Sequence, residues 1–283
     1  METQSGAPAL IYLYAFIPTE EYEKQEWDAI EGIEPPNEVE FIEYGEITAV
    51  TCRVPEAEYG EKKLQKQVEN MQWLQGRAFH HHELMNVLHD RFTVLPLKFG
   101  TIYSQPEHLT NSMEEHRDRL ASLFDYLHQK EEWNMKIFVD KSKFISAVVE
   151  NSPEMEEKKL EIENLSPGRK FFEKKKIDQF VEDTADENIK NTCKAIHEKL
   201  SQKSFNTEVK KNWERKVTGR EEEMSWNGVY LIDKAEREAL LSDITKQESE
   251  AKENNTGLSF EITGPWPAYH FSEFLNRGEE NGR

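Results

Sequence analysis

The sequence predicts an α+β protein of two domains, in which a sheet-containing first domain is joined by helices to a smaller α+β second domain. Three observations lead to this prediction. A chain of 283 residues is long for one domain and sufficient for two separate cores. Segments with strand pattern alternate with helical segments near both ends of the chain, and a highly charged helical stretch lies between them. We therefore expect a first domain over 1–140, a helical segment over 141–204 that packs with the second domain, a second domain over 205–275, and a tail over 276–283.

The first domain is expected to begin with a buried strand. Residues Ala9–Ile17 are a dense run of β-branched and aromatic residues that ends at Pro18, a pattern typical of a strand covered on both faces. Two shorter strands are predicted around Val39–Tyr44 and Ile47–Val54. Gly45 is the expected turn between them.

Helical and strand patterns then alternate to the end of this domain. From Glu56, apolar residues recur at three- and four-residue steps and predict a helix whose inward stripe includes Met71, Gln75 and His82. The segment 91–104 is predicted as a strand, with Pro96 at a sheet edge or a bulge because proline cannot donate a ladder hydrogen bond.

A helix over 106–129 and a strand over 133–140 are predicted to complete the first domain. The resulting order β-β-β-α-β-α-β favours a ferredoxin-like sheet with helices on one face.

The remainder of the chain is predicted to form the helical segment and the second domain. A long helix is expected from Arg169 to about Lys203, with apolar residues along one side and Lys and Glu along the other. After it, strand, helix and turn patterns predict the order β-β-α-β. The predicted elements are strands over 207–217, 224–232 and 258–263, and a helix over 233–252.

Charge and cysteine content exclude several classes of protein. The formal net charge of −19 opposes binding to nucleic acid and to anionic membranes. A basic partner, or one held by apolar contacts, fits better, although the acidity can also serve solubility alone. Cys52 and Cys193 stand far apart, as expected in a reducing cytoplasm. No run approaches the ~20 apolar residues of a membrane span, so a cytoplasmic location without membrane insertion is expected.

A run of histidines, His80–His82, is the feature that most resembles a metal site. Consecutive helical residues point about 100° apart, so the three rings cannot converge on one ion. His89 lies about two turns from His82, and Asn86 stands where a zincin motif has its second histidine. A metal-dependent enzyme built on this region therefore remains only an alternative, and we expect no metal or cofactor. One histidine is expected to pack inward while the others face solvent or a partner.

Recognisable catalytic motifs are missing from the sequence. There is no nucleophile elbow, no Walker A loop and no dinucleotide-binding glycine motif. The acidic clusters lack the spacing of a calcium-binding loop. The sequence therefore predicts a binding protein and not an enzyme.

The segment Gly264–Phe271 (GPWPAYHF) is the strongest candidate for a contact surface. Its two prolines restrict the backbone on both sides of Trp266, so the segment can form few ladder hydrogen bonds. Its order must depend on burying its aromatic side chains, either against its own domain or against another protein. Both alternatives stay open and are compatible. The candidate partner-binding residues are Trp266, Tyr269, Phe271 and His81.

The same segment resembles a known family. Thr263–Phe271 is similar to the C-terminal signature of the gas vesicle GvpL/GvpF proteins, except that Ala268 stands where the motif often has a third proline. Resemblance continues through the chain in the same order and is closest to the GvpL branch. The other similar segments are Ile11–Tyr14, Trp73–Glu83, Val94–Thr101, Leu165–Asp178 and Val209–Trp213.

This resemblance implies a two-domain α+β protein needed to build gas vesicles, the gas-filled protein shells of buoyant microbes. It further implies an accessory or minor structural component that binds other gas vesicle proteins, including the small shell protein. No catalytic residue is known in the family, so none is carried over. The resemblance leaves open which protein is the direct partner and whether the chain stays in the mature shell.

Overall fold

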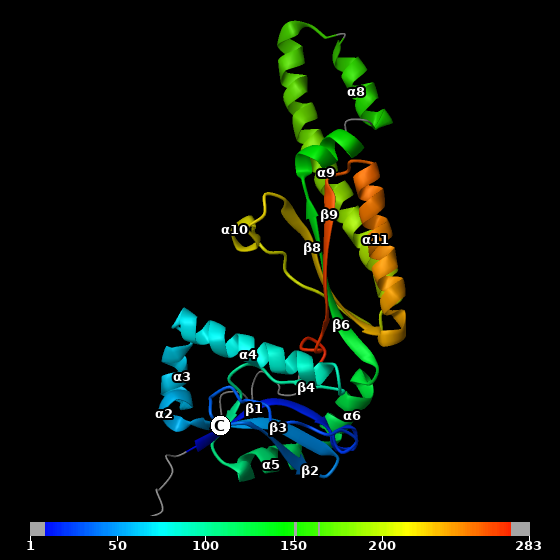
Figure 1. Ribbon diagram of the computed structural model, residues 1–283. Coiled ribbons are helices and arrows are strands. Elements are labelled where there is room, and N and C mark those ends of the chain that lie inside the picture. Colours follow the sequence, from blue (N-terminus) through cyan, green and yellow to red (C-terminus); the bar gives the residue numbers. More distant parts are fainter. Residues whose placement is uncertain (1–8, 150–151, 164, 273–283) are drawn as a thin grey trace, which may run out of the picture. The chain divides into compact units, whose positions relative to one another are not determined.

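The chain forms two compact units in the computed structural model, which describes residues 9–149, 152–163 and 165–272 (Figure 1). The first unit comprises residues up to Glu131 together with those from Trp266 onward, and the second comprises Glu132–Pro265. The second unit therefore begins near residue 132 and not after residue 140. The tail expected over 276–283 lies outside the described residues.

The first unit contains one antiparallel sheet. Its strands are β1 (Ala9–Pro18), β2 (Val39–Tyr44), β3 (Ile47–Pro55), β4 (Leu95–Pro96) and β5 (Ile102–Tyr103). The strand order is β2-β3-β1-β4, and β5 also pairs with β1. The hairpin β2–β3 has Gly45 at its turn with φ of 59°, a conformation that costs glycine little. Strands β1, β2 and β3 are those that the sequence predicted, but the strand predicted over 133–140 is not part of this sheet.

Helices cover both faces of this sheet, whereas the sequence predicted helices on one face. The helices are α1 (Thr19–Tyr22), α2 (Glu56–Tyr59), α3 (Glu61–Gln67), α4 (Met71–His89), α5 (Pro106–Glu115) and α6 (Arg117–Leu127). On one face Tyr12 of β1 meets His81 of α4. On the other, Tyr103 lies beside Ile11 and its hydroxyl donates to Ser112 of α5 at 3.2 Å. Figure 1 shows α4 and α5 on opposite sides of the strands. Because β1 is covered twice, its residues from Ile11 to Ile17 are all buried.

Two predictions for the first unit were wrong in detail. In place of the single strand expected over 91–104, the chain forms two short strands, β4 and β5. They are separated by a turn in which Gly100 has φ of 84°. The helix expected from Glu56 is broken at Gly60 and again at Asn70, whose side chain caps α4. The new start changes which face of α4 is buried. Met71 and Gln75, predicted to face the core, are exposed.

The second unit contains a four-stranded sheet with helices packed on one face. Its strands are β6 (Lys130–Val139), β7 (Asn206–Val209), β8 (Glu223–Asp233) and β9 (Leu258–Trp266), in the order β7-β8-β6-β9. Its helices are α7 (Lys141–Phe144), the π-helix Ile145–Val149, α8 (Pro153–Glu163), α9 (Pro167–Ser201), α10 (Arg215–Thr218), the 3₁₀-helix Lys234–Glu236 and α11 (Arg237–Glu253). β6, predicted to complete the first sheet, is a central strand of this one because its apolar residues meet α9 and α11.

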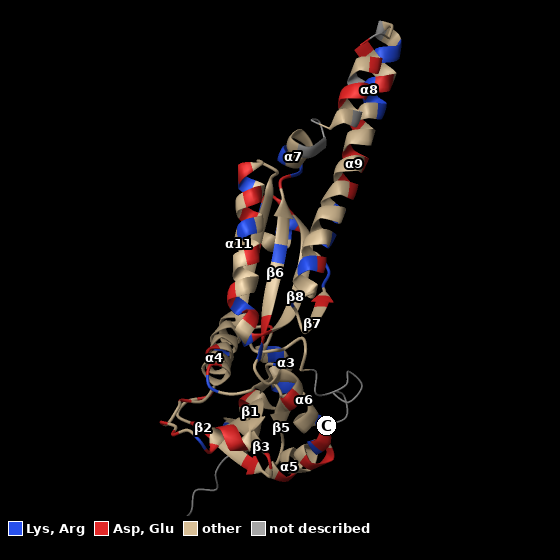
Figure 2. Ribbon diagram, turned by 90° about the vertical axis from the view of Figure 1, so that its right-hand side faces the viewer, with Lys and Arg blue, Asp and Glu red and all other residues tan. Residues whose placement is uncertain are grey.

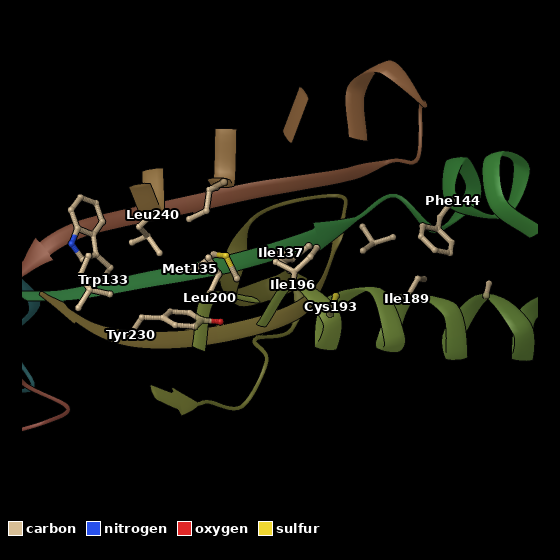
Figure 3. Packing of buried hydrophobic residues seen from close by; sticks show 14 of the residues in the cluster. Trp133, Met135, Ile137, Phe144, Ile189, Cys193, Ile196, Leu200, Tyr230 and Leu240 are labelled. Atoms are coloured by element: carbon tan, nitrogen blue, oxygen red, sulfur yellow. The ribbon is translucent and has the colours of Figure 1, made fainter. Parts of the chain in front are cut away.

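Alternate residues of β6 build the core of the second unit (Figure 3). From the strand, Met135 and Ile137 meet Cys193 and Ile196 of α9 and Leu240 of α11. Charged residues occupy the outer sides of α8, α9 and α11 (Figure 2). This division between apolar and charged sides is the amphipathic pattern that the sequence predicted for the long helix.

The opposite face of this sheet is closed by polar and cationic contacts. Arg220 lies 4.0 Å above the ring of Phe138 and also pairs with Glu261 at 3.2 Å. Lys136 pairs with the same carboxylate at 2.7 Å and lies 4.7 Å from the ring of Trp213. These contacts hold the segment after β7 against the strands. That segment, predicted as one strand over 207–217, is β7 followed by a loop and α10.

Candidate functional site

The segment that begins at Trp266 packs on the first unit, beside the histidine run of α4. The Trp266 and His82 rings lie 5.3 Å apart, centroid to centroid. The hydroxyl of Tyr269 lies 3.3 Å from Nε2 of His81. Ala268, which lies between Trp266 and Tyr269 in the sequence, is buried. The segment therefore reaches two consecutive histidines, although it is almost two hundred residues away in sequence.

His81 is the buried centre of this arrangement. Its Nδ1 lies 2.8 Å from the hydroxyl of Tyr12, and its ring stacks on Tyr14 with 5.6 Å between centroids. The Tyr12 hydroxyl accepts the backbone N–H of Gly100 at 3.2 Å. The Tyr12 hydroxyl can then donate its own proton to Nδ1 of His81. Because Nδ1 accepts this hydrogen bond, the imidazole proton is assigned to Nε2, which faces Tyr269. A chain of hydrogen bonds thus joins β1, α4 and the C-terminal segment.

Burial keeps this imidazole neutral. Desolvation is the main reason that the pKa of His81 falls from 6.5 to about 4; the neighbouring His80 and His82 contribute to this decrease, and a hydrogen bond to the backbone of Leu97 partly opposes it. Burial also raises the pKa of the Tyr12 and Tyr14 hydroxyls above their usual range. At neutral pH His81, Tyr12 and Tyr14 therefore carry no charge, and their polar atoms act through hydrogen bonds.

The three histidines point to different surroundings, as the helical spacing predicted. Nε2 of His80 lies 3.5 Å from the Tyr14 hydroxyl, while His81 faces Tyr12. His82 lies against Trp266, and its Nε2 is 3.3 Å from the amide of Asn86. Across the part of the chain that the structure describes, no group of three or more His, Cys, Asp or Glu residues is placed to hold a metal ion.

The cysteines are also unsuited to nucleophilic chemistry. Burial raises the pKa of the Cys52 thiol, and it raises that of Cys193 to about 12. Both thiols therefore stay protonated at neutral pH. The histidine run of α4 and the segment from Trp266 together provide an aromatic and hydrogen-bonding surface.

The start of the aromatic segment is fixed by a close approach within the second unit. Gly264 has φ of 147°, and a Cβ at this position would lie 2.8 Å from the indole of Trp133 and 2.9 Å from the carbonyl of Glu132. Only glycine fits such a contact without displacement. Gly264 therefore serves packing, and the aromatic residues that follow it reach the first unit.

The predicted contact residues differ in exposure. Trp266, Tyr269 and Phe271 are half-buried and keep surface that another molecule can reach, while His81 is only 4% exposed. Sequence reasoning placed Tyr12 and Tyr14 in a buried strand and did not link them to the histidines. Their spacing of two residues was the available signal, since it places both side chains on the same face of β1.

Comparison with known proteins agrees with this fold. Residues 10–273 match the family model described as gas vesicle synthesis protein GvpL/GvpF. The chain is 23% identical to gas vesicle protein L of Streptomyces sp. (strain CB03234), over 89% of this chain and 90% of that protein.

Two solved structures share the fold. The crystal structure of the gas vesicle protein GvpF from Anabaena sp. PCC7120 has a TM-score of 0.68 at 18% identity, and covers 95% of this chain and 100% of that one. GvpF from Microcystis aeruginosa has a TM-score of 0.59 at 18% identity, with 93% and 99% covered. Since the family match extends over both units and includes the segment from Trp266 to Ser272, the chain belongs to the gas vesicle synthesis protein GvpL/GvpF family.

Proposed function

We propose that this chain is a non-catalytic accessory protein of gas vesicle formation that acts in the cytoplasm and at the gas vesicle. In this proposal it binds other gas vesicle proteins, including the small shell protein, through the segment Trp266–Phe271. The observation that carries the proposal is the family match over residues 10–273, which ties the chain to gas vesicle formation. No helix among the described residues has the length and apolar character needed to cross a membrane.

The geometry of the segment supports this choice of surface. Trp266 and Tyr269 are each held on one side by a histidine of α4 and remain partly exposed on the other. Aromatic side chains that are already fixed lose little conformational entropy when a partner covers them. Because His81 is buried, its part in the proposal is to position Tyr269, and the direct contacts are assigned to Trp266, Tyr269 and Phe271.

Binding is tested with purified proteins. The full chain is titrated against each gas vesicle protein encoded with it, and Trp266→Ala is compared with the matched control Trp213→Ala in the second unit. We expect Trp266→Ala to weaken one of these interactions at least tenfold while circular dichroism shows a folded chain. Equal binding by the two variants would assign the contact to another surface.

The role in the cell is tested by complementation of a deletion strain. Wild type and Trp213→Ala should restore vesicles seen by electron microscopy, and Trp266→Ala should not. Probing washed vesicles for the chain then separates a resident component from an assembly factor that leaves. Normal vesicles in the deletion strain would refute the role in vesicle formation.

A further inference from the structure

The exposed side of α4 has a composition unlike that of the other long helices. Among the exposed residues of α4, Glu83 is the only charged one. Apart from Phe171 and Phe172 near the start of α9, the exposed sides of α9 and α11 consist mainly of Lys, Glu and Asp. In a chain of which 32% of the residues are charged, the nearly uncharged exposed side of α4 is unusual. The exposed residues are Met71, Gln72, Gln75, Gly76, Phe79, Glu83 and Val87.

Phe79 lies at the centre of this exposed side and is 62% exposed. At about 100° per residue, Gln75 and Glu83 flank it one turn away, and Gln72 and Asn86 lie about two turns away. Met71 and Val87 form the two edges, at 63% and 40% exposure.

Gly76 adds an independent observation. It lies inside a 19-residue helix, where glycine is less favourable than alanine, and a Cβ at this position would have nothing within 4 Å. No contact within the described chain accounts for this glycine. A position without a side chain on an exposed helix allows another helix to approach closely.

We propose that this side of α4 is a self-association surface, on which a second copy of the chain docks its own α4 in antiparallel orientation about a twofold axis at Phe79. A twofold interface must be complementary to itself, and this one pairs residues equidistant from Phe79. Phe79 meets Phe79 of the partner subunit. Gln75 faces the carboxylate of Glu83, Gln72 lies opposite Asn86, and the open space at Gly76 lies opposite His82, whose ring stays against Trp266 of its own chain.

Charge favours a second copy on this side over other parts of the surface. Each protomer carries a formal charge of −19, so most contacts between two copies would oppose carboxylates. Here each Glu83 is opposite an amide that can donate to it, and no two like charges meet. Interdigitation of four-residue ridges is also a common mode of helix packing. One helix pair lies at the low end of interface size, so we expect a weak, reversible dimer.

Sedimentation velocity of the full chain over a concentration series tests the proposal. Wild type should shift from monomer to dimer as concentration rises, and Phe79→Glu, which opposes two carboxylates at the axis, should raise the dissociation constant at least tenfold. Val217→Glu is the matched control, since Val217 is 63% exposed in the second unit and receives the same charge. A monomer at every concentration, or equal effects of the two substitutions, would overturn the proposal.

Three further variants test the register. Gln75→Lys should tighten the dimer about two- to tenfold by placing an ammonium group opposite each Glu83, and Gln75→Glu should weaken it. Gly76→Ala should weaken the dimer while raising the thermal unfolding midpoint of the monomer. Under oxidation, Phe79→Cys should cross-link and the α6 variant Ser122→Cys should not. The absence of a Phe79→Cys cross-link in a chain that does dimerise would exclude this twofold axis.

Discussion

At the scale of single residues, the histidine run is explained by the different surroundings of its members. His81 is the buried member, and its neutral imidazole links the Tyr12 hydroxyl to the Tyr269 hydroxyl at 2.8 and 3.3 Å. Such a group is tolerated in a core because both ring nitrogens have partners. His82 instead contributes a ring contact to Trp266. The sequence alone showed that the three rings diverge, but not which of them is buried.

Acidification should destabilise the first unit through His81. The unfolded chain binds a proton on this residue near pH 6.5, whereas the folded chain does so only near pH 4. Between these values the unfolded state holds more protons, so the free energy of unfolding falls as pH falls, by up to about 3 kcal/mol in total. Urea unfolding at several pH values measures this slope. His81→Gln should reduce this slope, and an unchanged slope would contradict the assignment to His81.

Replacing Gly264 by alanine should destabilise the second unit. The added methyl group would lie 2.8 Å from the Trp133 indole, at a backbone φ of 147°. We expect a loss of about 1–3 kcal/mol from steric conflict and backbone strain. Thermal unfolding gives the value. Gly168→Ala, where a Cβ would have nothing within 4 Å, is the control and should change stability by less than about 1 kcal/mol.

At the scale of elements, helix boundaries decided which residues became core. The pattern before Leu88 suggested one helix, but Asn70 caps a new one by accepting the N–H groups of Gln72 and Trp73. From this start α4 buries His81, Leu84, Met85 and Leu88. In α9 the apolar side that the sequence predicted includes Ile189, Cys193, Ile196 and Leu200, which are buried, whereas Phe172 near its start is 69% exposed. A periodic pattern identifies an apolar stripe, but not how far along the helix a neighbouring element covers it.

Replacing Gly76 by alanine should stabilise α4. The added methyl group meets nothing within 4 Å, and alanine loses less backbone entropy than glycine on helix formation. We expect a gain of about 0.5–1 kcal/mol in the free energy of unfolding, measured with urea at a concentration where the chain is monomeric. A loss of stability would indicate an internal contact at this position.

Helix α8 should depend on one buried residue for its attachment to the second unit. Met155 is fully buried in that core, and Lys158 lies 4.4 Å from the ring of Phe180 on α9. Met155→Ala removes the main apolar contact of a mostly charged helix, at a cost of about 2–5 kcal/mol. Hydrogen exchange should show loss of amide protection in α8. Leu160→Ala, at a residue 63% exposed, should leave that protection unchanged.

At the scale of the whole molecule, the chain crosses between its two units twice, once near residue 132 and again near Trp266. The first unit is therefore completed only when the last strand of the second has been made. Neither crossing is marked by a change of composition in the sequence. This explains why the predicted boundary after residue 140 assigned β6 to the first domain.

Ending the chain after Pro265 should destabilise the first unit selectively. Truncation removes Trp266 and Tyr269 from His82 and His81 and exposes apolar and polar groups that the full chain covers. Hydrogen exchange should show faster exchange in α4. Protection in β8 serves as the internal control, because Met224 and Val229 are buried within the second unit. Equal loss of protection in both units would contradict separate cores.

The sequence by itself determined the fold class, the hairpin at Gly45, the two-faced burial of β1 and the divergence of the three histidines. Each of these follows from local rules, namely side-chain alternation, helical spacing and turn preference. The tertiary structure alone decided that β6 belongs to the second sheet, that the segment from Trp266 packs against α4, and that Phe79 and Gly76 are exposed. These features depend on contacts between segments far apart in sequence. An apolar pattern shows that a face will be buried, but it does not specify which distant segment covers that face.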